Sequence, residues 1–266
     1  MRVSRELAHV TNYLCLPKLL FLLGTMYLLC PLPAKAAIGQ STAQSDCDNA
    51  LISAIHHKNV QEVGRIIGTG AVLDAKNCNG TTALIESIVS DQFKVTEKLV
   101  LAGTSLKTVD NKNTSPLMIA SAYCRQKFVA LLLAHGADVN AVDEDGYSPL
   151  MHSAQNCQDA KVPALLLTFG ARIGTTAKNG HTALFIASFY GNEQVVYALV
   201  AAGADIRAKT ENGETALTIA RDRDPGRKES HDRIYQYLLQ VSEIDKTRTN
   251  RPQPQTSLTP RETKHN

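Results

Sequence analysis

Apolar and polar positions follow one pattern along residues 48–241, and the pattern returns every 33 residues, with one step of 34. Each repeat holds two short segments whose apolar residues have the spacing of a one-sided helix. A single small helix pair cannot bury its apolar faces alone, so a fixed period of this length predicts a stack of helical units. One glycine keeps this period after the second segment: Gly70, Gly103, Gly136, Gly170 and Gly203.

The residues at the segment ends predict where each helix begins and ends. Serine or threonine opens the first segment, where its side-chain oxygen accepts a hydrogen bond from a backbone N–H that has no partner in the first turn; examples are Ser115, Ser148, Thr182 and Thr215. The repeating glycines suit left-handed C-terminal caps. Tight-turn dipeptides between the units predict hairpin fingers: Asn79-Gly80, Asp145-Gly146, Asn179-Gly180 and Asn212-Gly213.

Two short motifs carry a resemblance to a known family. The segments Ser115-Pro116-Leu117-Met118-Ile119-Ala120 and Thr182-Ala183-Leu184-Phe185-Ile186-Ala187 are similar to the ankyrin motif T-P-L-H-x-A. Gly136-Ala137-Asp138-Val139-Asn140 resembles the turn that ends an ankyrin repeat. The resemblance covers residues 48–241. It implies an all-α ankyrin-repeat solenoid of helix-turn-helix units with β-hairpin fingers, about six units including two caps.

The N-terminal sequence predicts a signal peptide for export, and the C-terminal sequence predicts a disordered tail. Residues 1–36 combine Arg2, Arg5 and Lys18 with the 12-residue apolar run Leu19–Cys30 and a small-x-small site at Ala34–Ala36, as in a cleaved signal peptide. The run is short against the roughly 20 residues needed to span a bilayer. We therefore expect a periplasmic or secreted protein with no stable membrane insertion after cleavage. Residues 37–47 read as a linker, and 242–266 as a disordered polar tail.

Charge and motif content limit the function classes. Residues 1–36 hold four of the 28 basic side chains and one of the 25 acidic ones, so the remaining chain is formally neutral. A neutral chain is a poor candidate for nucleic-acid binding by phosphate attraction. No catalytic constellation, metal-ligand spacing or phosphate loop stands out, which predicts a protein that is not an enzyme and needs no cofactor or metal. A thiol- or metal-dependent enzyme stays the outside alternative.

Four cysteines remain after the signal peptide: Cys47, Cys78, Cys124 and Cys157. An even number in an oxidising compartment favours disulfides. Cys124 and Cys157 lie at equivalent places in neighbouring units, whose helices stack up to about 10 Å apart, beyond the roughly 7 Å limit for a bridge. The extra residue within 155–159 offers a way to bring Cys157 closer. The sequence leaves three alternatives open: a Cys124–Cys157 disulfide, a Cys47–Cys78 disulfide, and four buried free thiols.

The resemblance also implies a binding face. In ankyrin arrays the hairpin tips and the ends of the first helices line a concave surface. Four of the chain's few aromatic residues fall there, and exposed aromatic side chains are typical of interaction hot spots. We expect partner contacts from Asn111, Lys112, Tyr123, Glu144, Asp145, Tyr147, Asn156, Lys178, His181, Phe189, Tyr190 and Glu211.

The sequence thus predicts a monomeric module that binds another protein, an enzyme or a toxin, outside the cytoplasm. One such function is that of an adaptor or protective partner in stress defence. The alternative is an immunity protein that neutralises a toxin acting in the periplasm. The fold alone does not determine which partner is bound.

Overall fold

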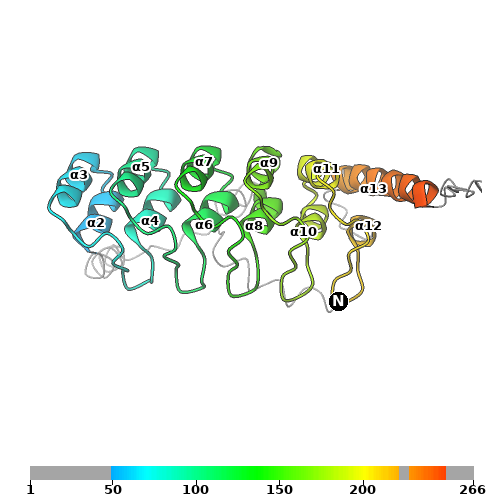
Figure 1. Ribbon diagram of the computed structural model, residues 1–266, viewed down its shortest axis with the longest axis horizontal. Coiled ribbons are helices and arrows are strands. Elements are labelled where there is room, and N and C mark those ends of the chain that lie inside the picture. Colours follow the sequence, from blue (N-terminus) through cyan, green and yellow to red (C-terminus); the bar gives the residue numbers. More distant parts are fainter. Residues whose placement is uncertain (1–48, 222–227, 250–266) are drawn as a thin grey trace, which may run out of the picture. The chain divides into compact units, whose positions relative to one another are not determined.

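The computed structural model describes residues 49–221 and 228–249, all within one compact unit, Gln44–Asn266. The described residues form twelve helices and no strand longer than an isolated bridge (Figure 1). The helices are α2 (Ala50–His56), α3 (Val60–Gly68), α4 (Ala83–Val89), α5 (Phe93–Leu101), α6 (Pro116–Ala122), α7 (Gln126–Ala134), α8 (Pro149–Asn156), α9 (Lys161–Thr168), α10 (Ala183–Tyr190), α11 (Glu193–Ala201), α12 (Ala216–Arg221) and α13 (Lys228–Thr249).

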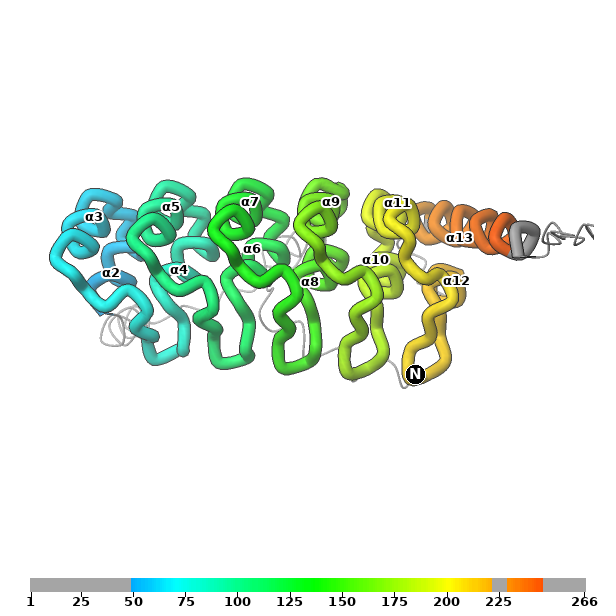
Figure 2. Tube along the Cα trace, viewed as in Figure 1, coloured from blue at the N-terminus to red at the C-terminus, as the bar shows by residue number. Residues whose placement is uncertain are grey.

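The helices form two layers. The first helix of each unit packs on the first helix of the next, from α2 through α12, and the second helices pack likewise from α3 through α13 (Figure 2). Each first helix also contacts the second helix of its own unit. The predicted all-α repeat solenoid is therefore confirmed, and a finger connects each unit to the next.

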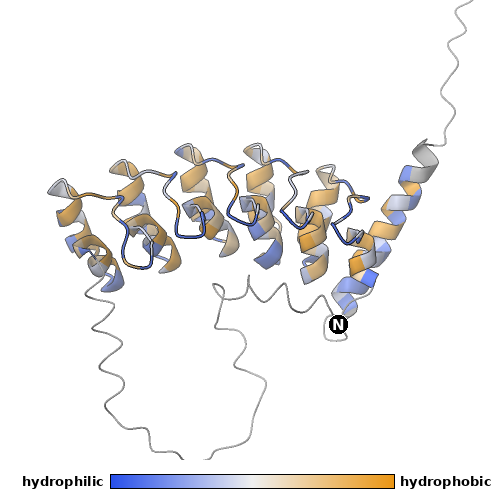
Figure 3. Cartoon of the chain, turned by 90° about the horizontal axis from the view of Figure 1, so that it is seen from below, coloured by the Kyte–Doolittle hydropathy of each residue, from blue (hydrophilic) through white to orange (hydrophobic). Residues whose placement is uncertain are grey.

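The core lies between the layers and repeats with the sequence. The leucines of four first helices, Leu84, Leu117, Leu150 and Leu184, are at most 1% exposed. Four leucines of the second layer, Leu99, Leu132, Leu166 and Leu199, are 0% exposed. Figure 3 shows that apolar residues concentrate on the helices and polar residues on the connecting loops. Stacking therefore buries the faces that one unit alone would leave exposed.

The predicted caps are present. The side-chain oxygens of Ser115, Ser148, Thr182 and Thr215 accept hydrogen bonds from the backbone N–H three residues later, at 3.2–3.4 Å. The five glycines after the second helices have φ between +75° and +89°, the left-handed region that favours glycine. Local sequence therefore fixes the start of these first helices and the end of the second helices.

The C-terminal boundary differs from the prediction. We expected the repeat domain to end at 241 and a disordered tail to begin at 242, but α13 continues to Thr249. An ion pair between Arg207 and Asp245, 2.7 Å apart, joins this extension to the loop before the sixth unit. The predicted signal peptide, the linker and residues 250–266 lie outside the described residues.

Candidate protein-binding face

Each finger closes through the same backbone hydrogen bonds. In the fourth unit, the Asp143 N–H donates to the Tyr147 carbonyl at 3.1 Å, and the Gly146 N–H donates to the Asp143 carbonyl at 3.1 Å. The Asp143 carboxylate also accepts from the N–H groups of Asp145 and Tyr147, at 3.0 and 2.8 Å. The predicted hairpins are therefore tight turns, and only two fingers carry an isolated β-bridge.

Neighbouring fingers are bonded to one another. The Lys178 N–H donates to the Asp145 carbonyl at 3.0 Å, and the Glu144 N–H donates to the Lys112 carbonyl at 3.2 Å. The Glu211 N–H continues this row by donating to the Asn179 carbonyl at 3.3 Å. Main-chain bonds between units hold the tips in register, so their side chains project from a fixed backbone.

This close approach of neighbouring fingers explains why a glycine is required in the fifth finger. Gly180 has φ +75°, and a Cβ placed there would lie 2.8 Å from the backbone N of Glu211. Both the left-handed backbone and the next finger therefore exclude a side chain at this position.

The structure exposes the predicted tip residues and covers some of the others. Exposed side chains belong to Asn111, Lys112, Glu144, Asp145, Lys178 and Glu211. Tyr123, at the C-cap of α6, is 38% exposed. The remaining candidates at the ends of the first helices and in the fifth finger are half-buried: Asn156, His181, Phe189 and Tyr190.

Tyr147 corrects the sequence prediction. We expected an exposed anchor, but Tyr147 is 6% exposed. Its hydroxyl lies 3.5 Å from His181 Nδ1 of the next finger, and its ring lies 5.9 Å from the His152 ring. Burial raises the pKa of the Tyr147 hydroxyl. Tyr147 therefore joins the fourth and fifth fingers and is not available as an anchor.

The fifth unit gathers aromatic side chains beside this contact. The His181 ring stacks on Phe185 at 4.5 Å, and Phe189 lies 6.4 Å from Phe185 and 5.0 Å from Tyr190. Burial lowers the pKa of His181, which favours the neutral imidazole against this apolar surface. The Tyr190 hydroxyl accepts a hydrogen bond from Gln155 Nε2 at 3.0 Å. These contacts therefore fix the orientation of the half-exposed Phe189 and Tyr190 rings.

Arg125 positions Tyr123, a role that the repeat pattern did not predict. Its guanidinium carbon lies 4.9 Å from the centre of the Tyr123 ring and 5.5 Å from that of Phe128. Nη2 donates to the Val89 carbonyl at 3.2 Å, and Nε lies 3.5 Å from the Asp91 carboxylate. The sequence around Arg125 gives no signal of this role, because its hydrogen-bond and ion-pair partners, Val89 and Asp91, come from the preceding unit.

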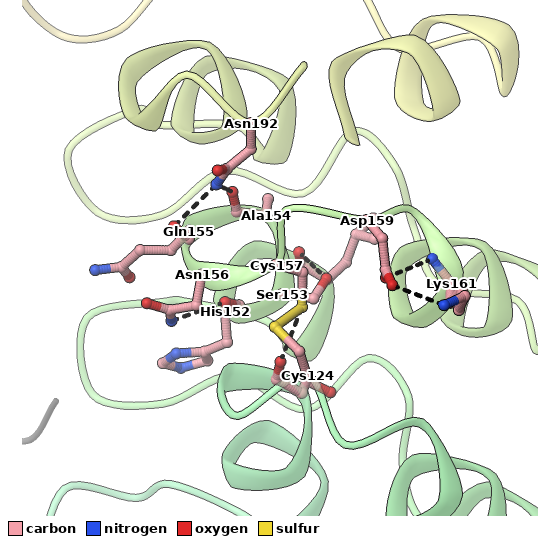
Figure 4. The surroundings of a disulfide bond; sticks show 12 residues. Cys124, His152, Ser153, Ala154, Gln155, Asn156, Cys157, Asp159, Lys161 and Asn192 are labelled. Atoms are coloured by element: carbon pink, nitrogen blue, oxygen red, sulfur yellow. Dashed lines mark hydrogen bonds and ion pairs between the residues drawn. A yellow bond between two sulfur atoms is a disulfide. The ribbon is translucent and has the colours of Figure 1, made fainter. Parts of the chain in front are cut away.

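The Cys124–Cys157 disulfide is present (Figure 4). The two Cα atoms are 5.5 Å apart, within the range for a bridge. Cys124 has φ +55°, like the corresponding residues Lys58 and Asp91 of earlier units, whereas Cys157 is extended, with φ −80° and ψ 130°. The extra residue of the fourth unit follows Cys157, in the longer connection between α8 and α9, and extended backbone at Cys157 replaces the left-handed turn. This change brings Cys157 within reach of Cys124.

The other cysteine pair stays a prediction. Cys78 is disulfide-bonded, but Cys47 lies outside the described residues.

The described residues contain no group of three or more potential metal ligands. No helix among them is long and apolar enough to cross a membrane. Two histidines take structural roles here: His152 Nε2 lies 2.9 Å from the Asp143 carboxylate, and His231 Nε2 lies 3.2 Å from the Phe189 carbonyl.

The repeated helix pairs, bonded fingers and caps agree with a family model described as ankyrin repeats (3 copies), which matches residues 90–177 and 161–250. The chain belongs to the ankyrin-repeat family. Ankyrin repeats are generally protein-binding modules without enzymatic activity, so protein binding is the general function of this domain. A comparison with curated proteins finds no match to this ankyrin chain.

Proposed function

We propose that these ankyrin units bind a partner protein through the fingertips and the ends of the first helices, outside the cytoplasm. The observation that carries the proposal is the row of fingers. Backbone bonds link the tips at Lys112, Asp145 and Asn179, while the tip side chains are exposed. A face that is ordered before binding loses little conformational entropy when a partner docks.

The chemistry of the face favours a folded protein partner. Lys112, Asp145, Lys178 and Glu211 present alternating charges on successive tips. Charges of this kind steer association and select a complementary surface and register. Tyr123, supported by Arg125, offers an aromatic anchor beside them. A charged rim with aromatic residues behind it is the usual composition of a protein interface.

Export is supported by two independent features. Residues 1–36 have the charge, apolar run and small-residue site of a signal peptide. The Cys124–Cys157 disulfide fits an oxidising compartment. In that compartment we propose that the protein acts as an adaptor or protective partner for an enzyme in stress defence.

The test is capture of a partner by the tagged mature protein from the matching compartment of its own cells. The fingertip variant carries Lys112→Ala, Asp145→Ala and Lys178→Ala. The control variant carries Lys94→Ala, Glu97→Ala and Lys127→Ala on the second helices, with the same net charge change and the same exposure. Both variants should keep the circular dichroism spectrum of the parent.

Loss of a captured protein with the fingertip variant alone would support the proposed face. Equal retention by both variants would overturn it. A resident enzyme as the captured protein favours the adaptor role, and a toxin delivered from outside favours the immunity role. Recovery of the full-length, uncleaved chain in the cytoplasmic fraction would contradict export.

A further inference from the structure

A groove separate from the fingertips lies between the last two second-layer helices. In the sixth unit α13, of 22 residues, takes the place of a second helix, and it packs beside α11, of nine residues. The groove is shallow and open to solvent, and the space over its lining is about 620 Å³. Its lining comes from α11 and α13 alone: Tyr197, Asp232, Arg233, Gln236, Tyr237 and Gln240.

Two tyrosine rings form the apolar part of the groove. The rings of Tyr197 and Tyr237 meet edge to face, with centroids 4.5 Å apart and an interplanar angle of 67°. The positions equivalent to Tyr197 in earlier units hold Glu97, Ala130 and Ala164. Tyr197 is therefore a local departure from the repeat, placed where α11 meets the longer terminal helix.

The polar wall is a stripe along α13. Asp232, Gln236 and Gln240 follow one another at intervals of four residues, so they lie on one side of the helix about 6 Å apart. All three are exposed. Each glutamine amide offers donors and an acceptor, and the Asp232 carboxylate offers acceptors.

The charges at the groove are largely compensated. Glu193 accepts a hydrogen bond from the Tyr197 hydroxyl at 2.6 Å and another from Arg233 Nε at 2.8 Å. The Tyr197 hydrogen bond, with help from Arg233, lowers the pKa of Glu193, and the same bond raises the pKa of Tyr197 to about 12. Tyr197 thus stays a neutral phenol, and Arg233 is paired with Glu193.

We infer that this groove binds a neutral saccharide. Tyrosine rings pack against the C–H faces of sugar rings, and planar amide and carboxylate groups pair with neighbouring hydroxyls. The lining has no aliphatic side chain to hold an acyl chain. Its arginine is already paired with a carboxylate, which disfavours an anionic ligand. An open groove with a row of hydrogen-bonding groups suits several sugar units in succession.

The test is a calorimetric titration of the mature protein with three neutral tetrasaccharides, cellotetraose, maltotetraose and chitotetraose. A sedimentation assay with purified cell-wall sacculi distinguishes a polymeric glycan from a free oligosaccharide. We expect saturable binding to at least one probe. The double variant Gln236→Ala, Gln240→Ala should weaken it at least tenfold, and Tyr237→Ala should abolish it.

The variant Lys94→Ala, Glu97→Ala, Lys127→Ala on α5 and α7 serves as the control, and it should bind the same probe as the parent does. Circular dichroism should show that the α13 variants keep their helix content. Absence of saturable binding to every probe would overturn the inference, as would binding that is unchanged in the double glutamine variant.

Discussion

Removing the Cys124–Cys157 disulfide gives the most direct test of how this array is held together. We propose the variant Cys124→Ser, Cys157→Ser, compared with the oxidised parent. The bridge spans 33 residues of sequence. In the chain-entropy model, a loop of this length stabilises the folded state by about 4 kcal/mol at 25 °C, because the cross-link restricts the unfolded chain.

The backbone conformation at Cys124 makes a second, smaller contribution to the free energy of unfolding. Its φ is +55°, and a left-handed conformation costs a residue with a side chain roughly 1–2 kcal/mol. The serine variant keeps this cost. The variant Cys124→Gly, Cys157→Ser removes it, since Gly191 already adopts φ +71° at the corresponding place in the fifth unit. We therefore expect the glycine variant to be about 1 kcal/mol more stable than the serine variant.

The assay is urea unfolding of the mature protein, monitored by circular dichroism, with and without a reductant. The serine variant should lose about 4 kcal/mol of unfolding free energy, or about 10 °C of melting temperature. The reductant should lower the stability of the parent more than that of the variant, because the variant keeps only the disulfide of Cys78. A loss below about 1 kcal/mol would refute the loop-entropy argument. Equal stability of the glycine and serine variants would refute the argument from the backbone.

Two further predictions concern the fifth finger. Gly180→Ala should cost at least about 2 kcal/mol, because of its φ of +75° and the backbone 2.8 Å from a new Cβ. Gly174→Ala, with no atom within 4 Å, should change stability by less than about 0.5 kcal/mol in the same unfolding assay; equal losses would contradict the close-contact argument. Burial lowers the pKa of His181 below its ordinary 6.5, so the unfolded chain takes up this proton first and unfolding free energy should fall as pH drops below 6.5. His181→Gln should flatten this fall in urea titrations between about pH 7 and 5, and an unchanged slope would refute the assignment.

Local rules were enough to predict the helix ends and the repeat. Ser148 and Thr182 cap helices because their oxygens reach an N–H three residues away, and the hydrogen bond needs no distant partner. Likewise Gly136 and Gly203 take the left-handed backbone at their own positions. These interactions close within a few residues, so the sequence pattern contains all that is needed to place them.

The burial of individual side chains depended on neighbouring units. Tyr147 stands at a position that the repeat exposes, yet the next finger covers it because His181 lies 3.5 Å from its hydroxyl. Arg125 gained its role beside Tyr123 only through Val89 and Asp91 of the preceding unit. The side-chain contacts between units join residues as few as 26 and as many as 42 positions apart, and the repeat pattern does not specify which side chains meet.

The sequence by itself determined the period, the caps, the turns and hence an ankyrin array, because those features follow from short-range hydrogen bonds and burial of one helix face. Only the tertiary structure decided that Cys124 and Cys157 meet, since one inserted residue had to change the backbone at the end of α8. It also decided that α13 continues beyond the stack's usual helix length and forms a groove with α11. Both outcomes depend on how neighbouring units pack in space.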